Sequence, residues 1–374
     1  MRKKVVSLVV AVVAVALFSF ACAPTSTPAP EQVQEVELLG GSGSNYYTSV
    51  AAAEILNKYD PYVRVSALET ASTQSNAEMS RAKDPNAFLM NGGFDGIQAF
   101  PWMGLEDFEG KEPITDLRWI CALNFGHHAW VTLDPKIKSM KDFDGKSVAI
   151  MPSLALRRTF EIAFELLDVD VEIKSMGFSD QYNALKDGLV AGCLWLSTGP
   201  PGHPFTPVPP LQQLAEIKDV YAVPFPHELK KDVEPIYYER FGYPKEHSLT
   251  VALPGSLPTQ TEPMEVFSCI NNGFLCKADA DEELIYEITR TLVEHYSELG
   301  EIYPGLQHIT PELMVQLMPL ECLPRSAKTI GRTDLANIKY EDLIHPGALK
   351  YYKEIGLWPE AWDARDEVRV IRED

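Results

Sequence analysis

The chain has 374 residues, a formal net charge of −20 at pH 7 and 45% hydrophobic residues. A protein this acidic offers no basic stripe to neutralise phosphates, which argues against nucleic-acid binding. The length exceeds that of a typical single hydrophobic core and favours two domains.

The N-terminal segment is typical of an export signal. Basic residues at positions 2–4 precede an uncharged apolar run at 5–20, and Cys22 follows a small residue. We therefore interpret residues 1–21 as a lipoprotein signal peptide and Cys22 as its acylated residue. Residues 22–35, rich in proline, serine and threonine, are expected to form a flexible linker. An uncleaved membrane helix is the alternative. Either anchor places the folded part outside the cytoplasm, in the periplasm or at the cell surface.

The most informative stretch follows this linker. An apolar strand-like run at 36–39 ends in the glycine-serine loop 40–44, and a helix-like run follows at 49–59. Free backbone N–H groups at a helix N-terminus point at whatever lies beyond the strand end, and glycines let a ligand approach the main chain. A plain turn is the alternative, because neither a dinucleotide fingerprint nor a phosphate-binding loop is present. The expected ligand contacts here are Gly41, Ser42, Ser44, Asn45, Tyr46 and Tyr47.

Strand-like and helix-like runs then alternate along the chain. This alternation predicts an α/β fold with mostly parallel sheets, in which ligands bind beyond the carboxyl ends of the strands. The six prolines between 198 and 210 predict a rigid surface loop. The strand-like runs lie at 36–39, 63–68, 87–90, 120–123, 129–133, 147–150, 171–174 and 192–196, and the helical patterns between them at 73–81, 156–167 and 180–188.

The C-terminal third contains two further predicted helices. Apolar residues recur at helical spacing from 284 to 299. Asp279 and Glu282 form an expected capping box before this helix, and Gly300 is its expected stop. A last helix is predicted at 346–355, because a proline opens it and a glycine follows it.

Cysteine usage gives no sign of a metal or redox site. Five cysteines follow Cys22, at positions 121, 193, 269, 276 and 322. They are far apart and odd in number, without CxxC or zinc-ligand spacing. We expect buried free thiols, with one disulfide as the alternative in an oxidising compartment. No metal, cofactor or catalytic residue is expected, since no Ser-His-Asp pattern, HExxH motif or nucleophile elbow stands out.

Further residues at strand ends are expected to line a cleft. Ser153 and Arg157 open the helix after 147–150, where N–H groups and a guanidinium would hold a carboxylate. The alternative places the arginine in solvent. His127 lies where the chain is expected to cross between domains, and a plain interface histidine is the alternative. The expected residues are Thr70, Asn91, Gly92, Phe94, His127, Ser153 and Arg157.

Four motifs, in order and with matching spacing, resemble the TAXI family of TRAP-transporter solute-binding proteins. They are the run Leu39-Gly40-Gly41-Ser42-Gly43-Ser44-Asn45-Tyr46-Tyr47, the segment 134–150, the run 182–188 that leads to Ser197-Thr198-Gly199-Pro200-Pro201, and the segment 345–352. The resemblance adds Ser197 and Thr198 to the expected ligand contacts. It departs after 147–150, where the family's glycine and threonine are replaced and only Pro152, Ser153 and an arginine match.

The resemblance implies a two-domain periplasmic-binding-protein fold of the second class, a Venus flytrap that closes on its ligand. Domain I is expected at 36–124 plus 268–374, and domain II at 125–267. It also implies an extracytoplasmic receptor that captures a small organic acid, either a carboxylate or an amino-acid-like compound, and delivers it to a TRAP permease. A receptor of the same fold for an ABC importer is the alternative. An exported enzyme is the third hypothesis, and we do not expect it.

Overall fold

The computed structural model describes residues 33–200, 202–243, 248–268 and 272–358. The expected signal peptide, Cys22, Cys269 and the C-terminal tail lie outside the described residues. No helix in the described ranges combines the length and apolar composition that crossing a membrane requires.

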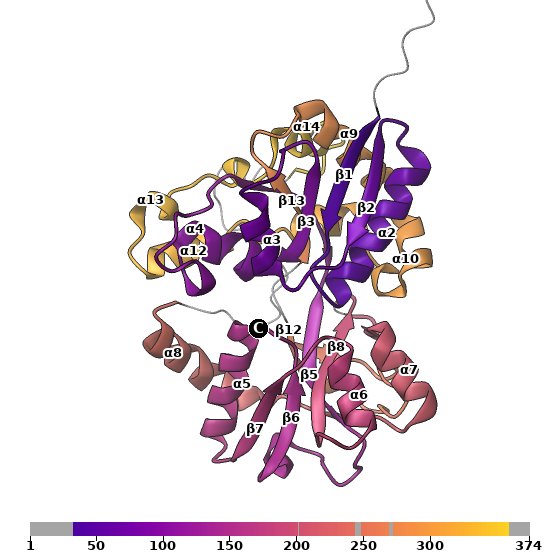
Figure 1. The fold of residues 1–374 in the computed structure, drawn as a ribbon, viewed down its shortest axis with the longest axis vertical. Coiled ribbons are helices and arrows are strands. Elements are labelled where there is room, and N and C mark those ends of the chain that lie inside the picture. The colour runs from indigo at the N-terminus through magenta and orange to yellow at the C-terminus, as the bar shows by residue number, and fades with distance from the viewer. Residues whose placement is uncertain (1–32, 201, 244–247, 269–271, 359–374) are drawn as a thin grey trace, which may run out of the picture. The chain divides into compact units, whose positions relative to one another are not determined.

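The first sheet has five strands and is of mixed direction (Figure 1). The central strand β1 runs parallel to its neighbours β2 and β3, whereas β13 runs antiparallel to β3 and β4. The strands, in their order across the sheet, are β2 (Val63–Leu68), β1 (Gln34–Leu39), β3 (Phe88–Gly93), β13 (Asn272–Lys277) and β4 (Leu117–Asn124).

The second sheet has eight strands and is also mixed. Strand β6 is parallel to β7 and β8, and the pairs that involve β5 are antiparallel. The order is β11 (Ser248–Ala252), β12 (Met264–Ser268), β5 (Gly126–Thr132), β8 (Gly192–Thr198), β6 (Lys146–Ile150) and β7 (Val171–Ser175), with β9 (Thr206–Pro207) on β8 and β10 (Tyr221–Val223) on β5.

Helices cover both sheets. Helix α2 packs on β1, β2 and β3 and also touches α9, while α5 and α6 lie on opposite sides of the second sheet (Figure 1). The helices are α2 (Ser44–Tyr59), α3 (Thr73–Ser80), α4 (Phe100–Met103), α5 (Leu154–Leu166), α6 (Asp180–Lys186), α7 (Pro209–Ile217), α8 (Lys230–Phe241), α9 (Glu282–Glu294), α10 (Tyr296–Ile302), α11 (Pro311–Gln316), α12 (Cys322–Thr329), α13 (Thr333–Ala336) and α14 (Pro346–Glu354). A π-helix spans Asp95–Ala99, and 3-10 turns span Glu106–Phe108, Met140–Phe143, His227–Leu229, Pro304–Leu306 and Tyr340–Asp342.

The predicted α/β class with two lobes is confirmed, but the prediction of mostly parallel sheets is wrong. Strands β4 and β13 belong to the first sheet, while their chain neighbours β5 and β12 belong to the second. The chain therefore passes twice between the sheets, and each passage brings in strands that run antiparallel to their neighbours. A strand–helix alternation in the sequence does not reveal the direction of such strands. The predicted domain boundaries remain a prediction.

The helix predicted at 284–299 is two helices. Helix α9 ends at Glu294, the φ of −111° and ψ of 21° at His295 interrupt the helical path, and α10 begins at Tyr296. The cap of α9 is Asp281, which accepts from the Leu284 N–H at 2.9 Å, so the predicted capping box is wrong. Gly300 lies inside α10, where a Cβ would come within 2.5 Å of the Gln307 Cα. Close packing, rather than a helix stop, explains this glycine.

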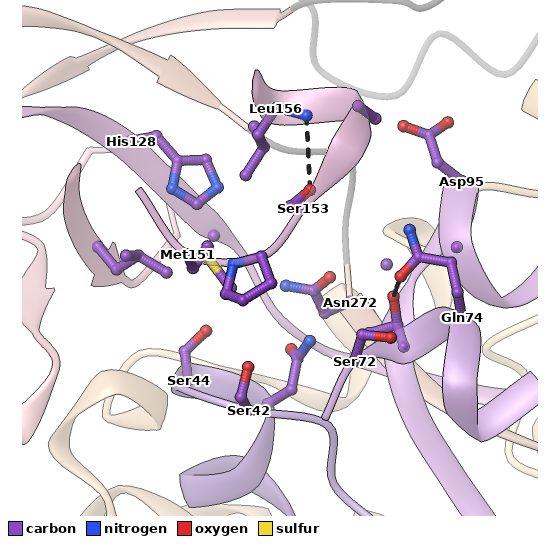
Figure 2. Close-up of a pocket in the computed structure, with 18 of the residues that line it drawn as sticks. Ser42, Ser44, Ser72, Gln74, Asp95, His128, Met151, Ser153, Leu156 and Asn272 are labelled. Carbon is purple, nitrogen blue, oxygen red and sulfur yellow. Dashed lines mark hydrogen bonds between the residues drawn. The ribbon is translucent and has the colours of Figure 1, made fainter. Parts of the chain in front are cut away.

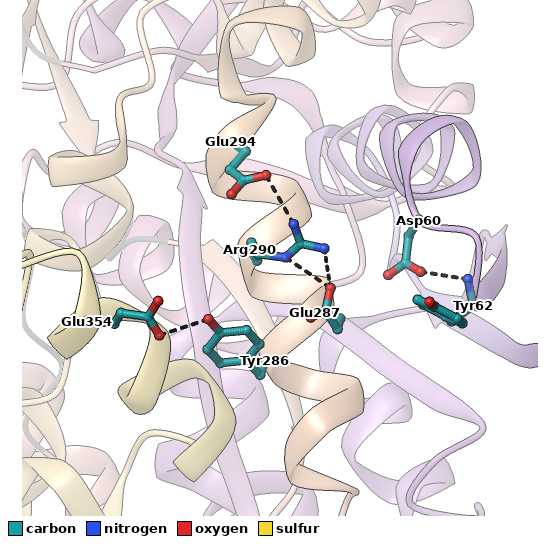
Figure 3. Close-up of polar contacts among 7 residues, drawn as sticks. All are labelled: Asp60, Tyr62, Tyr286, Glu287, Arg290, Glu294 and Glu354. Atoms are coloured by element: carbon teal, nitrogen blue, oxygen red, sulfur yellow. Dashed lines mark hydrogen bonds and ion pairs between the residues drawn. The ribbon is translucent and has the colours of Figure 1, made fainter.

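Helix α9 is fastened by polar contacts on its outer face (Figure 3). The Tyr286 hydroxyl donates to Glu354 of α14 at 2.9 Å, and Arg290 pairs with both Glu287 and Glu294. In the same view, Asp60 accepts from the Tyr62 N–H at 2.8 Å after α2 ends. Burial raises the pKa of the Asp60 carboxyl. The Tyr286–Glu354 contact joins α9 to α14, whereas the others lie within α9 or within one turn, and all have a structural role.

Four cysteines fall within the described residues and all are buried free thiols, as predicted: Cys121, Cys193, Cys276 and Cys322. Burial raises the pKa of the Cys121 thiol to about 12. A thiol with so high a pKa is a poor nucleophile at neutral pH. Burial also raises the pKa of Cys193 and Cys276, so these two and Cys121 act as small apolar core side chains.

Candidate functional site

A cavity of about 120 Å³ lies beyond the carboxyl ends of strands from both sheets. It is lined by the loops that follow β1, β2, β3 and β6, together with residues of β5, β8, β12 and β13 (Figure 2). Its size suits a small molecule rather than a peptide. The lining residues are Ser42, Ser44, Asn45, Ala71, Ser72, Thr73, Gln74, Gly93, Phe94, Asp95, Gly96, Phe100, Gly126, His128, Met151, Pro152, Ser153, Ala155, Leu156, Leu196, Phe267 and Asn272.

Three helices present their first turns to this cavity. Ser44 and Asn45 begin α2, Ser72 is the N-cap of α3, and Ser153 is the N-cap of α5. None of these three helices has an acidic residue in its first turn. First-turn N–H groups lack intrahelical partners, and the helix dipole places partial positive charge there. The cavity is therefore favourable for an anionic group.

The glycine-serine loop has the geometry that brings its main chain to the cavity. Gly41 and Gly43 have φ of +64° and +65°, a region that glycine enters at little cost. A Cβ on Gly43 would lie 2.6 Å from the ring of Phe178. Ser44 is only 6% exposed and lines the cavity. Its hydroxyl can therefore contact a ligand that enters the cavity.

The loop after β6 contributes less than the sequence suggests. Ser153 caps α5 by accepting from the Leu156 N–H at 3.4 Å (Figure 2). Arg157, the expected anion anchor, does not line the cavity. Its Nε donates to Glu161 at 2.7 Å, one turn further along α5, and its side chain is 42% exposed. This (i, i+4) pair occupies the guanidinium at the helix surface.

Of the two adjacent histidines, His128 lines the cavity and the expected His127 does not. Consecutive residues of β5 face opposite sides of the sheet. His127 stacks on Phe205 with centroids 3.7 Å apart, and its Nε2 donates to the Gly199 carbonyl at 2.7 Å. Burial lowers the pKa of His127 to about 4, so this side chain is neutral at pH 7. It fastens the proline-rich loop to the far face of the second sheet.

A carboxylate also reaches the cavity. Asp95 follows β3 and lies across the cavity from Ser42 and Ser44 (Figure 2). The Tyr243 hydroxyl donates to Asp95 Oδ1 at 2.9 Å. Burial and the neighbouring Asp95 charge raise the pKa of Tyr243, so its hydroxyl stays a donor. Among the lining residues there is no lysine or arginine, and Asp95 is the one carboxylate.

The structure brings five of the expected residues into the cavity wall: Ser42, Ser44, Asn45, Phe94 and Ser153. Four others lie directly behind the wall, namely Gly41, Thr70, Asn91 and Gly92, which contact lining residues or the strand ends that carry them.

The remaining expected residues lie elsewhere. Tyr46 neighbours Tyr47, whose ring lies 5.8 Å from that of Tyr303, and Thr198 hydrogen-bonds the Tyr303 hydroxyl at 3.0 Å. Ser197 pairs with His127 across β5 and β8 and is buried away from the cavity.

Several lining residues were not named individually among the expected ligand contacts. Ser72 and Gln74 lie in the segment 70–76 after β2, which the sequence marks as a source of hydroxyls and amides, and Asp95 follows β3. The rule that ligands bind at the carboxyl ends of strands could have found them. Asn272 opens β13 beside Gly93 and is 7% exposed. Its strand was missing from the sequence-based elements, so no signal pointed to it.

In comparisons with known proteins, one family model matches this chain. The NMT1-like family matches residues 39–356. No curated protein matches the chain. A solved chain described as "Structure of a periplasmic transporter" is 14% identical with a TM-score of 0.49, over 82% of this chain and 98% of that one. The alkanesulfonate-binding protein SsuA from Xanthomonas axonopodis pv. citri, bound to MOPS, is 11% identical with a TM-score of 0.42, over 88% and 85%. None of these comparisons names the TAXI family, so that finer resemblance remains a prediction.

Proposed function

Because this chain belongs to the NMT1-like family, and because its cavity suits a small anion, we propose that it is an extracytoplasmic solute-binding protein. It captures a small organic acid and delivers it to a permease in the membrane. The observation that carries this proposal is the meeting of three helix N-termini at one cavity, with Ser42, Ser44, Ser72 and Ser153 among its lining residues.

The cavity favours a ligand with one carboxylate. Main-chain N–H groups and the hydroxyls of Ser42, Ser44, Ser72 and Ser153 can donate to that carboxylate without a lysine or arginine. Asp95, on the far side, would repel a second carboxylate and would accept from a hydroxyl or ammonium group. The proposed ligand is therefore a monocarboxylate that carries a hydroxyl or amino group.

The direct test is to identify what the protein carries. The full chain is purified without refolding, and the small molecules released by heat are analysed by mass spectrometry. Binding of hydroxy acids, amino acids and dicarboxylates is then titrated calorimetrically. We expect one site per chain with a Kd in the micromolar range or tighter, which is roughly −8 kcal/mol or beyond. Absence of saturable binding across these acids would contradict the proposal, and turnover of a bound compound would indicate an enzyme.

Asp95 supplies a sharper test of the ligand class. Asp95→Asn removes the repulsion without changing the shape of the side chain, so the variant should gain affinity for dicarboxylates and lose it for amino acids. Asp107→Asn makes the same change of net charge at an exposed residue outside the cavity. Equal effects of the two variants would show that Asp95 does not face the ligand.

Two membrane partners are compatible with this receptor. The motifs that resemble the TAXI family favour a TRAP permease driven by an ion gradient, whereas membership of the NMT1-like family does not single out that partner and leaves an ATP-driven importer as the alternative. Uptake of the identified ligand by intact cells separates them. Collapse of the ion gradients at constant ATP should stop uptake through a TRAP permease, and depletion of ATP at a maintained gradient should stop uptake through an ABC importer.

Lipid anchoring at Cys22 is part of the proposal. Cys22→Ser should release the protein from membranes, and mass spectrometry of the membrane-bound protein should find acyl chains on the N-terminal cysteine. Recovery of the variant with the membranes would favour the uncleaved membrane helix.

A further inference from the structure

Two buried asparagines lie directly behind the loops that line the cavity. Asn76 on α3 and Asn91 on β3 are both 0% exposed, and neither lines the cavity. A buried amide costs free energy unless its polar atoms are hydrogen-bonded. The partners of these two side chains therefore indicate what they do for the fold.

Asn76 joins the carboxyl ends of three strands. Its Nδ2 donates to the Leu39 carbonyl at the end of β1 (3.1 Å) and to the Asn91 carbonyl in β3 (3.4 Å). Its Oδ1 accepts from the Thr70 hydroxyl, just beyond β2, at 2.5 Å. The three loops that form this wall of the cavity follow β1, β2 and β3, close to these three hydrogen bonds. One side chain thus fixes the spacing of three loops.

Asn91 connects β3 to the first turn of α2. Its Nδ2 donates to the Asn45 carbonyl at 2.8 Å and to the Ser49 hydroxyl at 3.2 Å. The Ser49 hydroxyl in turn donates to the same Asn45 carbonyl at 2.8 Å. The Asn91 Oδ1 is buried without a partner among the described residues, so the amide donors are what the fold uses.

We propose that Asn76 and Asn91 are positioning residues, which hold the main chain at 40–45, 70–74 and 91–96 so that its N–H groups and hydroxyls face the ligand. This inference rests on the proposed function, because it assumes that the cavity binds a ligand. The asparagine side chain suits the task because one amide supplies two donors and an acceptor in a fixed plane. An ionised aspartate side chain has no hydrogen-bond donor, and a leucine side chain has neither a donor nor an acceptor.

The glycines behind the wall belong to the same arrangement. A Cβ on Gly92 would lie 2.6 Å from Thr73 Cγ2, so the end of β3 packs against the first turn of α3. Gly41 approaches the Asn76 Nδ2, which would lie 3.8 Å from an added Cβ. The Thr70 N–H also donates to the Gly41 carbonyl at 2.9 Å. The loops are therefore cross-linked to one another as well as to the asparagines.

The test measures local opening in the full chain, without any ligand. Amide hydrogen exchange is followed by mass spectrometry in wild type, Asn91→Ala and Thr70→Val. Thr70→Val removes one bond of the network while it preserves the shape of the side chain and leaves both asparagines in place. Asn57→Ala is the matched control. Asn57 also makes two hydrogen bonds between α2 and β2, to the main chain of Val65 (2.8 and 2.7 Å), but lies outside the cavity wall.

Loss of the two Asn91 bonds should accelerate exchange at 40–49 about tenfold or more, because each bond contributes on the order of a fivefold change in a local opening equilibrium. Thr70→Val should accelerate exchange at 40–49 and 70–76 by about threefold to fivefold. Exchange in β5 should stay at its wild-type rate. The Asn57→Ala variant should accelerate exchange only around 54–66.

Two results would overturn the inference. One is a uniform acceleration of exchange along the whole chain. The other is that the loops exchange no faster in Asn91→Ala and Thr70→Val than in Asn57→Ala. If Asn91→Ala does not fold, Thr70→Val alone decides. Because no ligand enters this experiment, failure to find a bound acid contradicts the proposed function and leaves the positioning result intact.

Discussion

Behind the loops that follow β1, β2 and β3 lie hydrogen-bonded amides and hydroxyls, whereas behind the loop that follows β6 lies an aromatic cluster. The first wall is tied by Asn76, Asn91 and Thr70. The second is backed by Trp130, whose ring lies 4.9 Å from Phe160, with Phe143 and Phe164 around it. Both walls offer helix N-termini to one cavity, but different forces hold them.

Because of this difference, one wall mainly sets the geometry of the site and the other mainly contributes to the stability of the fold. Hydrogen bonds between side chains and main chain fix direction as well as distance. Aromatic packing contributes a large burial free energy but tolerates small rearrangements of volume and shape. We therefore expect changes in the first wall to affect the geometry of the site and changes in the second wall to affect global stability.

The largest expected effect comes from the aromatic cluster. Phe160→Ala should destabilise the protein by about 3–5 kcal/mol, because it leaves a cavity among fully buried rings. Chemical denaturation followed by tryptophan fluorescence measures the loss. Leu154→Ala, at a position 40% exposed on the same helix, is the control and should cost less than about 1 kcal/mol. Similar losses in both variants would contradict the assignment of stability to the cluster.

The far face of the second sheet, where His127 contacts Phe205 and Gly199, should make stability depend on pH. His127 has its pKa lowered from 6.5 to about 4, so between these values the unfolded chain binds the proton more strongly than the folded one. Stability is then lost as the pH falls from 6.5 towards 4, by on the order of 3 kcal/mol. Denaturation midpoints between pH 7 and 4 test this.

The matched variant for this titration is His127→Gln, which retains a donor for the Gly199 carbonyl and cannot titrate. Subtracting its pH profile from that of wild type removes the contributions of other histidines. An identical profile in the two proteins would show that His127 is not the group responsible. The asparagines of the first wall do not titrate, so no matching loss is expected there.

The helix caps in the two walls should differ in how much they contribute to stability. Ser72 takes part in a full capping box with Ser75, whereas Ser153 accepts one long bond of 3.4 Å. Ser72→Ala should therefore cost about 1 kcal/mol and Ser153→Ala about half as much. Thermal denaturation of both variants gives the ranking, and a larger loss from Ser153→Ala would show that the hydrogen-bond geometry does not set the strength of these two caps.

The smallest effect is expected from Arg157→Ala. The guanidinium pairs with Glu161 at the exposed surface of α5, so stability should change by less than about 0.5 kcal/mol and affinity for an acid should not change. Calorimetric titration of the acid identified with the protein checks this. A tenfold loss of affinity would restore the sequence-based role of this arginine as an anion anchor.

The fold could be predicted closely where a strand is bounded by clear turn residues. The run at 63–68 matches β2 at both ends, and the run at 192–196 differs from β8 only by its last two residues. Strands β11, β12 and β13 were missed even though Pro254 and Gly255 follow β11 and Pro263 precedes β12, so such boundaries are not sufficient. Strand direction was also missed, because the passages between sheets depend on contacts that are distant in the sequence.

The site could be predicted only in part, because alternation along a strand and burial behind a loop are three-dimensional properties. His127 and His128 have the same chemistry, and the strand geometry alone decides which one faces the cavity. Asn91 follows an apolar run as a ligand residue would, yet its amide donates to the main-chain carbonyl of Asn45. The sequence shows that such residues lie at a strand end but not on which side of the loop they act.

The contact between Gly43 and the ring of Phe178 limits how this chain can diverge. Position 43 combines a left-handed backbone with no room for a methyl group, so a mutational scan should tolerate glycine alone there while neighbouring serines accept other small residues. A change of solute preference in this protein is therefore expected from substitutions at cavity positions such as 42, 44 and 95, with Gly43 kept.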